Sequence, residues 1–189
     1  KETTVTISRT KLSNFTANIK SEHNTTDIHG NIITKKVFID RIARLLIEEE
    51  ISNDSSVASQ KIIVNGLNIK HRTMSNLETQ YAYDGLRRLI SVTEPRIGTT
   101  HITYHSATGK IGLHASITDA ANNTTTFEYD SNTGRLIWEK NPLNHYTRYA
   151  YNSRGQKTKI CGDAVNPVEF QNDNYGQQLV VKTFRTPLV

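Results

Sequence analysis

The sequence predicts an all-β protein built from antiparallel β-hairpins, on three observations. Apolar and polar residues alternate over short stretches such as "TQYAYD" (79–84) and "TTFEYD" (125–130), which is the pattern of a strand with one buried face. Asp, Asn or Gly follows such stretches and favours a turn. Hydrophobic residues make up 35% of the chain and the eight Tyr outnumber the five Phe, which fits half-buried strands better than a helical core.

A repeat of about 22 residues organises these stretches. A polar anchor residue closes each copy, at Asp40, Asn65, Asp84, His105, Asp130, Asn152 and Asp173. The third residue before the anchor is always apolar or aromatic: Val37, Ile62, Tyr81, Ile102, Phe127, Tyr149 and Phe170. The residue directly before it is Ile39, Val64, Tyr83, Tyr104, Tyr129 or Tyr151, and Asn172 breaks the column. Such columns predict strands that share one covered face.

The anchors are expected to fold the turns between paired strands. Asp and Asn accept hydrogen bonds from backbone N–H groups two residues on, and a glycine that can adopt positive φ follows several anchors. A second set of turns, at Glu94, Asp119 and Asn141, joins one hairpin to the next. Each repeat is therefore predicted to hold two strands and two turns.

The segment "DRIARLLIEEEI" (40–51) has two interpretations. Propensity alone favours a short helix. Its register matches the copy at Asp84, with Arg44 and Leu45 in the places of Arg88 and Leu89, so a turn and a return strand are preferred. Residues 1–26 alternate without a clear anchor and are predicted to be divergent strands, whereas residues 27–189 form the repeat array.

The strings "YAYDGLRRLISV", "FEYDSNTGRLIWE", "NPLNHYTRYAYNSRGQ" and "DIHGNIITKKVFIDRIARL" resemble the YD repeats of the RHS family. The resemblance covers about residues 27–180. It implies a spiral sheet of hairpins, as in the shells of RHS proteins, ABC-type toxin components and teneurins, in which bacterial members can enclose a toxin. It also implies a secreted or cell-surface protein and a capacity to bind carbohydrate. The chain departs from the pattern at His105, Asn65, Asn152 and Asn172, and it lacks the self-cleaving aspartate motif of many bacterial members.

The sequence carries few signs of catalysis or of a bound cofactor. The Asp residues serve the turns, no nucleotide-binding or hydrolase motif occurs, and Cys161 has no partner motif. His101 and His105 lack a third ligand at metal-binding spacing. The charge of +5 is dispersed, unlike the basic patch of a nucleic-acid binder. No apolar run approaches the ~18 residues of a membrane span. We therefore expect no enzyme, no cofactor, no metal, no nucleic-acid partner and no transmembrane segment.

The predicted function is structural: a segment of a shell or extracellular scaffold. Its expected partners are flanking repeats of the same chain, or further copies that associate through open sheet edges. The alternative is a carbohydrate-binding surface module. Trp138 and Tyr146 are aromatic residues outside the repeat columns, and His145 adjoins Tyr146, so these three are the candidate sugar-binding residues. Trp138 has a second interpretation as a packing residue of its strand.

Overall fold

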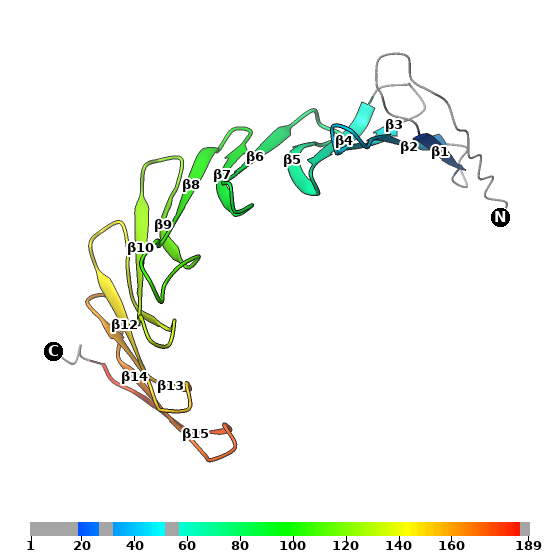
Figure 1. Cartoon of the computed structure of the whole chain (residues 1–189). Helices are drawn as coiled ribbons and strands as arrows, with labels where there is room; N and C mark the ends of the chain where they lie inside the picture. Colours follow the sequence, from blue (N-terminus) through cyan, green and yellow to red (C-terminus); the bar gives the residue numbers. More distant parts are fainter. Residues whose placement is uncertain (1–18, 27–31, 52–56, 186–189) are drawn as a thin grey trace. The chain divides into compact units, whose positions relative to one another are not determined.

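The computed structural model describes residues 19–26, 32–51 and 57–185, which form strands, turns and connecting segments without a helix. Fifteen strands form one antiparallel sheet in which the spatial order is the order of the sequence. Successive strands are joined as hairpins, as the ribbon shows (Figure 1). The all-β hairpin prediction is therefore confirmed.

Segment 40–51 is a turn followed by a strand, so the helical alternative is wrong. Residues 1–18, which belong to the predicted divergent strands, lie outside the described part of the chain, as do residues 27–31.

The chain divides into two units at Thr99–Thr100, within strand β8, and each unit is described by itself. The strands of the first unit are β1 (Ile19–Thr26), β2 (Ile32–Asp40), β3 (Leu45–Ile51), β4 (Val57–Val64), β5 (Leu67–Arg72), β6 (Glu78–Tyr83) and β7 (Leu89–Glu94). The return strands β3 and β7 begin at Leu45 and Leu89, directly after an arginine, as the repeat predicts.

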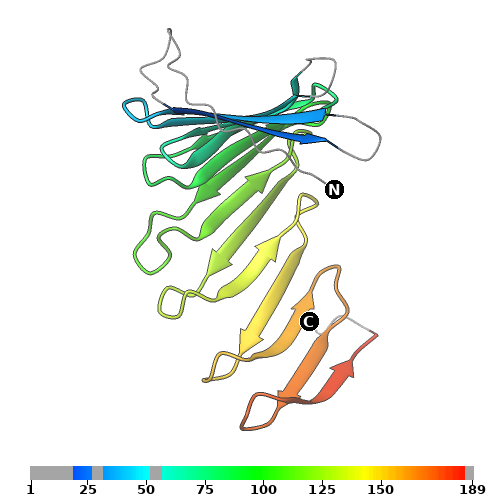
Figure 2. The same ribbon diagram turned by 90° about the vertical axis from the view of Figure 1, so that its right-hand side faces the viewer.

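The strands of the second unit are β8 (Gly98–Tyr104), β9 (His114–Thr118), β10 (Thr124–Tyr129), β11 (Leu136–Lys140), β12 (Tyr146–Tyr151), β13 (Lys157–Gly162), β14 (Val168–Asn172) and β15 (Gln178–Thr183). Turns alternate between the two ends of these strands (Figure 2). One end carries the anchor turns, which we call the anchor side; the other carries the turns between hairpins, which we call the far side.

The aromatic columns occupy one face of the sheet. In β12 the alternation is clear, because Tyr149 and Tyr151 are half-buried while Arg148 and Ala150 are exposed. Tyr149 pairs with Ile160, which in turn pairs with Val168, so apolar residues of three strands stand in one row. These rows follow from the period-two pattern of the sequence.

Burial in this sheet is partial. Among residues whose burial is described, only Asp40 and Pro167 are buried, and most strand residues are half-buried. The apolar columns therefore gain their cover from neighbouring strands within the sheet. A single hairpin would leave its column exposed on both sides, so stability depends on consecutive hairpins.

A β-bulge recurs beside the anchor turn, and the sequence pattern alone did not reveal it. The register shifts between the second and the first residue before the anchor in five hairpins: at Ala82/Tyr83, Thr103/Tyr104, Glu128/Tyr129, Ala150/Tyr151 and Gln171/Asn172. A bulge places one extra residue on the return strand and increases the local twist.

The copy at Asp40 differs from these five. Its ladder runs without a register shift to the pair Asp40–Leu45, around a loop of residues 41–44. As a result, Val37 and Ile62 do not stand in one row, although the repeat aligns them: Ile62 pairs with Ile47, which pairs with Phe38. The predicted column is therefore wrong at Ile62, which stands in a row with Lys70 and Gln80. Val37 stands in the row of Lys61, His71 and Thr79, on the same face as Tyr81.

Candidate functional site

Five of the seven anchor turns are each built around one carboxylate or amide oxygen. In the β6–β7 turn, Asp84 Oδ1 accepts the backbone N–H groups of Leu86 and Arg88, both at 2.9 Å. Asp84 Oδ2 accepts the Arg88 guanidinium at 2.7 Å from Nε and 2.6 Å from Nη2. The Arg88 backbone N–H, followed by its guanidinium, lowers the pKa of Asp84 below its usual value. This aspartate is fully engaged in folding its turn.

The same turn recurs at both ends of the strands. Asp119, Asn141, Asn152 and Asp173 each accept backbone N–H groups two and four residues on, at 2.8–3.0 Å. The third residue after each of these adopts positive φ: Asn122, Asn144, Gly155 and Gly176. Arg87 occupies that place after Asp84, with φ 66°. The role predicted for the anchors as turn residues is therefore correct, and the far-side turns use the same hydrogen bonds.

Two anchors fold their turns differently. Asn65 and Gly66 both have positive φ, 52° and 77°, which is the two-residue type I′ hairpin turn. His105 lies just beyond β8, and its Nε2 is 3.0 Å from the carbonyl oxygen of Phe127 in the next hairpin. Its ring also meets the Tyr129 ring edge-on, with centroids 5.7 Å apart. His105 is a packing and hydrogen-bonding residue at this position.

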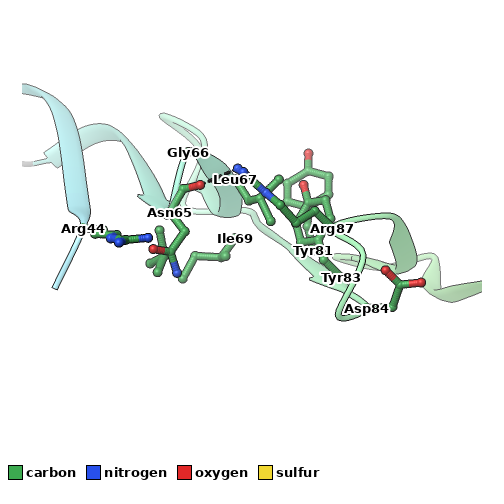
Figure 3. A pocket seen from close by; sticks show the side chains of 10 residues that line it. Arg44, Asn65, Gly66, Leu67, Ile69, Tyr81, Tyr83, Asp84 and Arg87 are labelled. Atoms are coloured by element: carbon green, nitrogen blue, oxygen red, sulfur yellow. Dashed lines mark hydrogen bonds between the residues drawn. The ribbon is translucent and has the colours of Figure 1, made fainter.

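A cavity lies in the first unit beside the anchor turns (Figure 3). Its volume is about 620 Å³. Leu67, Ile69, Tyr81 and Tyr83 supply its apolar walls. The polar residues of its rim are Arg44, Asn65, Asp84 and Arg87. Sequence reasoning did not predict this cavity, because it depends on the approach of three successive anchor turns.

Two hydrogen bonds shape the cavity. Arg87 Nη2 donates to the carbonyl oxygen of Asn65 at 2.5 Å, which ties the β6–β7 turn to the β4–β5 turn. The Tyr83 hydroxyl donates to the carbonyl oxygen of Asn68 at 3.0 Å, and burial raises the pKa of Tyr83. With Asp84 bound to Arg88, the lining offers guanidinium groups and tyrosine rings but no nucleophile activated by a base.

Trp138 and Tyr146, two of the predicted sugar-binding residues, lie in contact. Their ring centroids are 5.2 Å apart with an interplanar angle of 76°. Trp138 belongs to the row Glu128–Trp138–Arg148 on the face opposite the aromatic columns. Both residues are half-buried.

Cationic side chains surround Tyr146. Arg148 Cζ lies 5.0 Å and Lys140 Nζ 5.6 Å from the centroid of the Tyr146 ring, within range of cation–π attraction. His145, the third predicted residue, is exposed in the β11–β12 turn and donates its backbone N–H to Asn141 Oδ1 at 3.0 Å. The cluster thus consists of Trp138, Tyr146, Lys140 and Arg148, without the imidazole of His145.

A polar cavity of about 280 Å³ lies beside this cluster. It is lined by Asn122, Asn123, Thr124, Thr126, Lys140, Asn141, Pro142 and Asn144, so amides, hydroxyls and one ammonium group converge there. Lys140 belongs both to this cavity and to the surroundings of Tyr146. The sequence feature that could have indicated this cavity is the pair of Asn-rich far-side turns, which are neighbours in the sheet.

The residues considered for other chemistry are accounted for in the described part of the chain. No group of three metal-ligating residues occurs there, and His101 pairs with Thr118 in the β8–β9 ladder. Asp130 accepts the Thr133 hydroxyl and backbone N–H at 2.8 Å each. Cys161 is a half-buried free thiol. No helix long and apolar enough to cross a membrane is found among the described residues.

Comparisons with known proteins give a limited result. No family model matches the sequence. The crystal structure of TcdB2-TccC3-Cdc42 resembles 88% of this chain with a TM-score of 0.49 and 11% identity. The crystal structure of TcdB2-TccC3-TEV resembles 86% of it with a TM-score of 0.22 and 10% identity. The chain spans about 11% of the length of each of these proteins.

Proposed function

We propose that this chain is a non-catalytic structural segment of an RHS/YD-repeat shell or extracellular scaffold, of the kind that encloses a toxin or displays a surface. The observation that carries the proposal is the recurrence of one building unit: anchor turn, turn-side bulge and aromatic column. A unit that repeats along an open sheet builds a wall. The apolar columns stabilise this wall and its polar face keeps it soluble.

The sheet edges support continuation of the wall. Strand β15 pairs only with β14, and all six of its residues are exposed, Leu179 and Val181 among them. A strand edge with exposed apolar residues favours further pairing. In the proposed function, flanking repeats of the same chain or another copy supply the missing strands.

The test is the size and location of the native gene product. An antibody raised against this segment is used to blot the secreted, surface and cytosolic fractions of the source organism. The proposal expects a secreted or surface species far larger than the 21.3 kDa of this chain. A cytosolic species near 21.3 kDa would contradict it.

A second candidate function is carbohydrate binding at the cell surface, and the Trp138–Tyr146 pair is the observation that favours it. Sugars pack their C–H faces on aromatic rings, and the adjoining cavity offers amide and hydroxyl partners. Trp138 is the only tryptophan of the chain, so its fluorescence reports on this site alone. A panel of neutral and uronic-acid oligosaccharides should shift the emission of the parent chain.

The variant Tyr146→Ala should lose that response, whereas Tyr175→Ala, at a turn of the same unit, should keep it. An unchanged emission across the panel would reject the sugar site.

A further inference from the structure

The most exposed apolar side chains of this protein are concentrated in its turns. Eight large hydrophobic residues of the described chain are at least 65% exposed, and Leu179 is the only one of them in a strand. The seven others lie in turns: Ile42 (80%), Met74 (67%), Leu86 (69%), Ile97 (66%), Ile111 (65%), Leu143 (74%) and Tyr175 (93%). Single exposed apolar residues need no explanation, but their concentration at the ends of hairpins does.

Four of these seven residues occupy the same position in their turns. Ile42, Leu86 and Tyr175 are each the second residue after an anchor aspartate, and each donates its backbone N–H to that carboxylate at 2.8–2.9 Å. Leu143 bears the same relation to Asn141 on the far side, at 3.0 Å. The turn therefore fixes the backbone of the tip residue while its side chain remains free. Folding the turn requires the anchor side chain and a residue that adopts positive φ, but it does not require an apolar side chain at the tip. The apolar tip therefore has a role other than folding the turn.

We propose that these tips form an edge-to-edge contact surface, whose partner is the far side of a second copy of this chain lying against the anchor side of the first. This inference rests on the proposed wall-building function and names how one row of hairpins meets the next. The anchor-side tips are Ile42, Leu86, Ile111 and Tyr175, and the far-side tips are Met74, Ile97 and Leu143.

Spacing identifies a hairpin array as the partner. Every hairpin places one turn at each end of its strands, so tips on both sides recur at the width of two strands, about 10 Å. Another array of the same hairpins repeats at the same interval. Each apolar tip of one row can then lie between tips of the other, and the burial of such side chains stabilises the contact.

Charge favours opposite sides over like sides. In the first unit the anchor-side turns hold the exposed arginines Arg41, Arg44 and Arg87. In the second unit the far-side turns 119–123, 141–145 and 163–167 hold Asp119 and Asp163, both exposed, and no Lys or Arg. An arginine-bearing side meets an aspartate-bearing side more favourably than it meets itself. The contact is therefore heterologous, and it can propagate from copy to copy.

Thiol cross-linking tests the pairing of the two sides. Leu86 lies in an anchor-side turn beside Arg87, and Leu143 lies in the far-side turn 141–145, so this pair samples the two sides that the charges favour. Leu86→Cys and Leu143→Cys are made separately in full-length chains that also carry Cys161→Ser, one with a short tag, and are mixed under mild oxidation. The mixed disulfide should exceed the share of about one half that random pairing of two thiols gives.

A random distribution of the three dimers, or an excess of the Leu86→Cys homodimer, would overturn the proposal. A matched pair distinguishes tip contacts from strand-edge pairing. In sedimentation velocity, the double variant Leu86→Ser/Leu143→Ser should weaken self-association. Val181→Lys, on the edge strand β15, should leave the tip cross-link unchanged. Loss of the cross-link on Val181→Lys alone would show that the strand edge, not the tips, joins the copies.

Circular dichroism confirms that each variant retains the sheet. The proposed function is tested separately by the size of the native gene product. A large secreted species combined with random cross-linking would reject the tip contact and leave the wall-building function standing.

Discussion

The backbone of Gly109 lies against the carbonyl group of Ser131 in the anchor turn of the next hairpin. A side-chain carbon at Gly109 would overlap the Ser131 carbonyl oxygen, and the φ of 81° at Gly109 is itself unfavourable for any residue with a Cβ. The anchor turns that follow β8 and β10 therefore touch through their backbones. A side chain makes a similar contact between two later turns. The guanidinium of Arg135 lies over Gly155, and its Nη1 is 3.4 Å from the Asn152 carbonyl oxygen.

Three alanine substitutions separate backbone strain from this contact. Gly85→Ala should change stability little, because its φ is ordinary and nothing lies within 4 Å. At Gly112 there is open space for a methyl group, but φ is 85°. Gly112→Ala should therefore lower the free energy of unfolding by about 1–2 kcal/mol from backbone strain alone. Gly109→Ala should lower the free energy of unfolding clearly more than Gly112→Ala does, because the Ser131 backbone must move as well. Urea unfolding measures all three, and equal losses at Gly109 and Gly112 would contradict the close approach.

The turn aspartates should make the sheet sensitive to acid. Hydrogen bonds lower the pKa of Asp84, Asp119 and Asp130, chiefly from the Arg88 backbone, the Asn123 side chain and the Thr133 hydroxyl, respectively. Because the folded pKa lies below the unfolded value of about 3.9, the stabilisation is complete above that value and is lost as the pH falls through the folded pKa. The urea midpoint should therefore drop between about pH 5 and pH 2.

Asp119→Asn gives the matched control for this acid effect. An amide oxygen can still accept the N–H groups of Ala121 and Asn123, now at 2.9 and 2.8 Å, but it does not titrate in this range. The variant should remain folded at neutral pH with a shallower dependence of the urea midpoint on pH. A slope identical to that of the parent would show that Asp119 takes no part in acid unfolding.

Tyr149 should be among the last tyrosines to ionise. Burial, followed by its hydrogen bond to Glu139 Oε1 at 2.9 Å, raises the pKa of Tyr149 to about 12. Since the folded pKa exceeds the unfolded value of about 10, this group's contribution to stability is present below about pH 10 and is lost as the pH rises towards 12. Ultraviolet difference spectra follow the ionisation, and Glu139→Gln should move one late step to lower pH. No change in the late steps would contradict the Tyr149–Glu139 pairing.

The sequence was sufficient to predict the hairpins but not how they join. Asp84 and Asp173 could be recognised as turn residues, because an Asx turn is local and needs only the anchor and its next four residues. The aromatic columns could be recognised because strand alternation is local too. The bulge beside Tyr83 and the contact of Gly109 with Ser131 depend on how strands twist against their neighbours. Alternation indicates which residues share a face, but it does not show where a bulge shifts the register.

The candidate sites show the same division. Trp138 and Tyr146 were selected as aromatics outside the columns, and the ladder places them side by side because Trp138 pairs with Arg148 and Lys140 pairs with Tyr146. The cavity beside Tyr81 and Tyr83 was missed, since its lining comes from three turns that lie up to 43 residues apart in the chain, from Arg44 to Arg87. Local patterns predict which residues fold a turn, whereas a cavity between turns follows from their spacing in the sheet.

Tyr83 offers the most direct measurement of what a column residue contributes beyond its ring. Its hydroxyl donates to the Asn68 carbonyl oxygen at 3.0 Å across the β5–β6 pair, and burial raises its pKa. Tyr83→Phe keeps the ring and removes this bond, so the free energy of unfolding should fall by about 1 kcal/mol. Tyr81 lies in the same strand and lines the same cavity, so Tyr81→Phe is the control. It should lower the free energy of unfolding by less. If both variants lose the same amount in urea unfolding, the Tyr83 hydroxyl does not join the two hairpins, and the column stabilises the sheet through its rings alone.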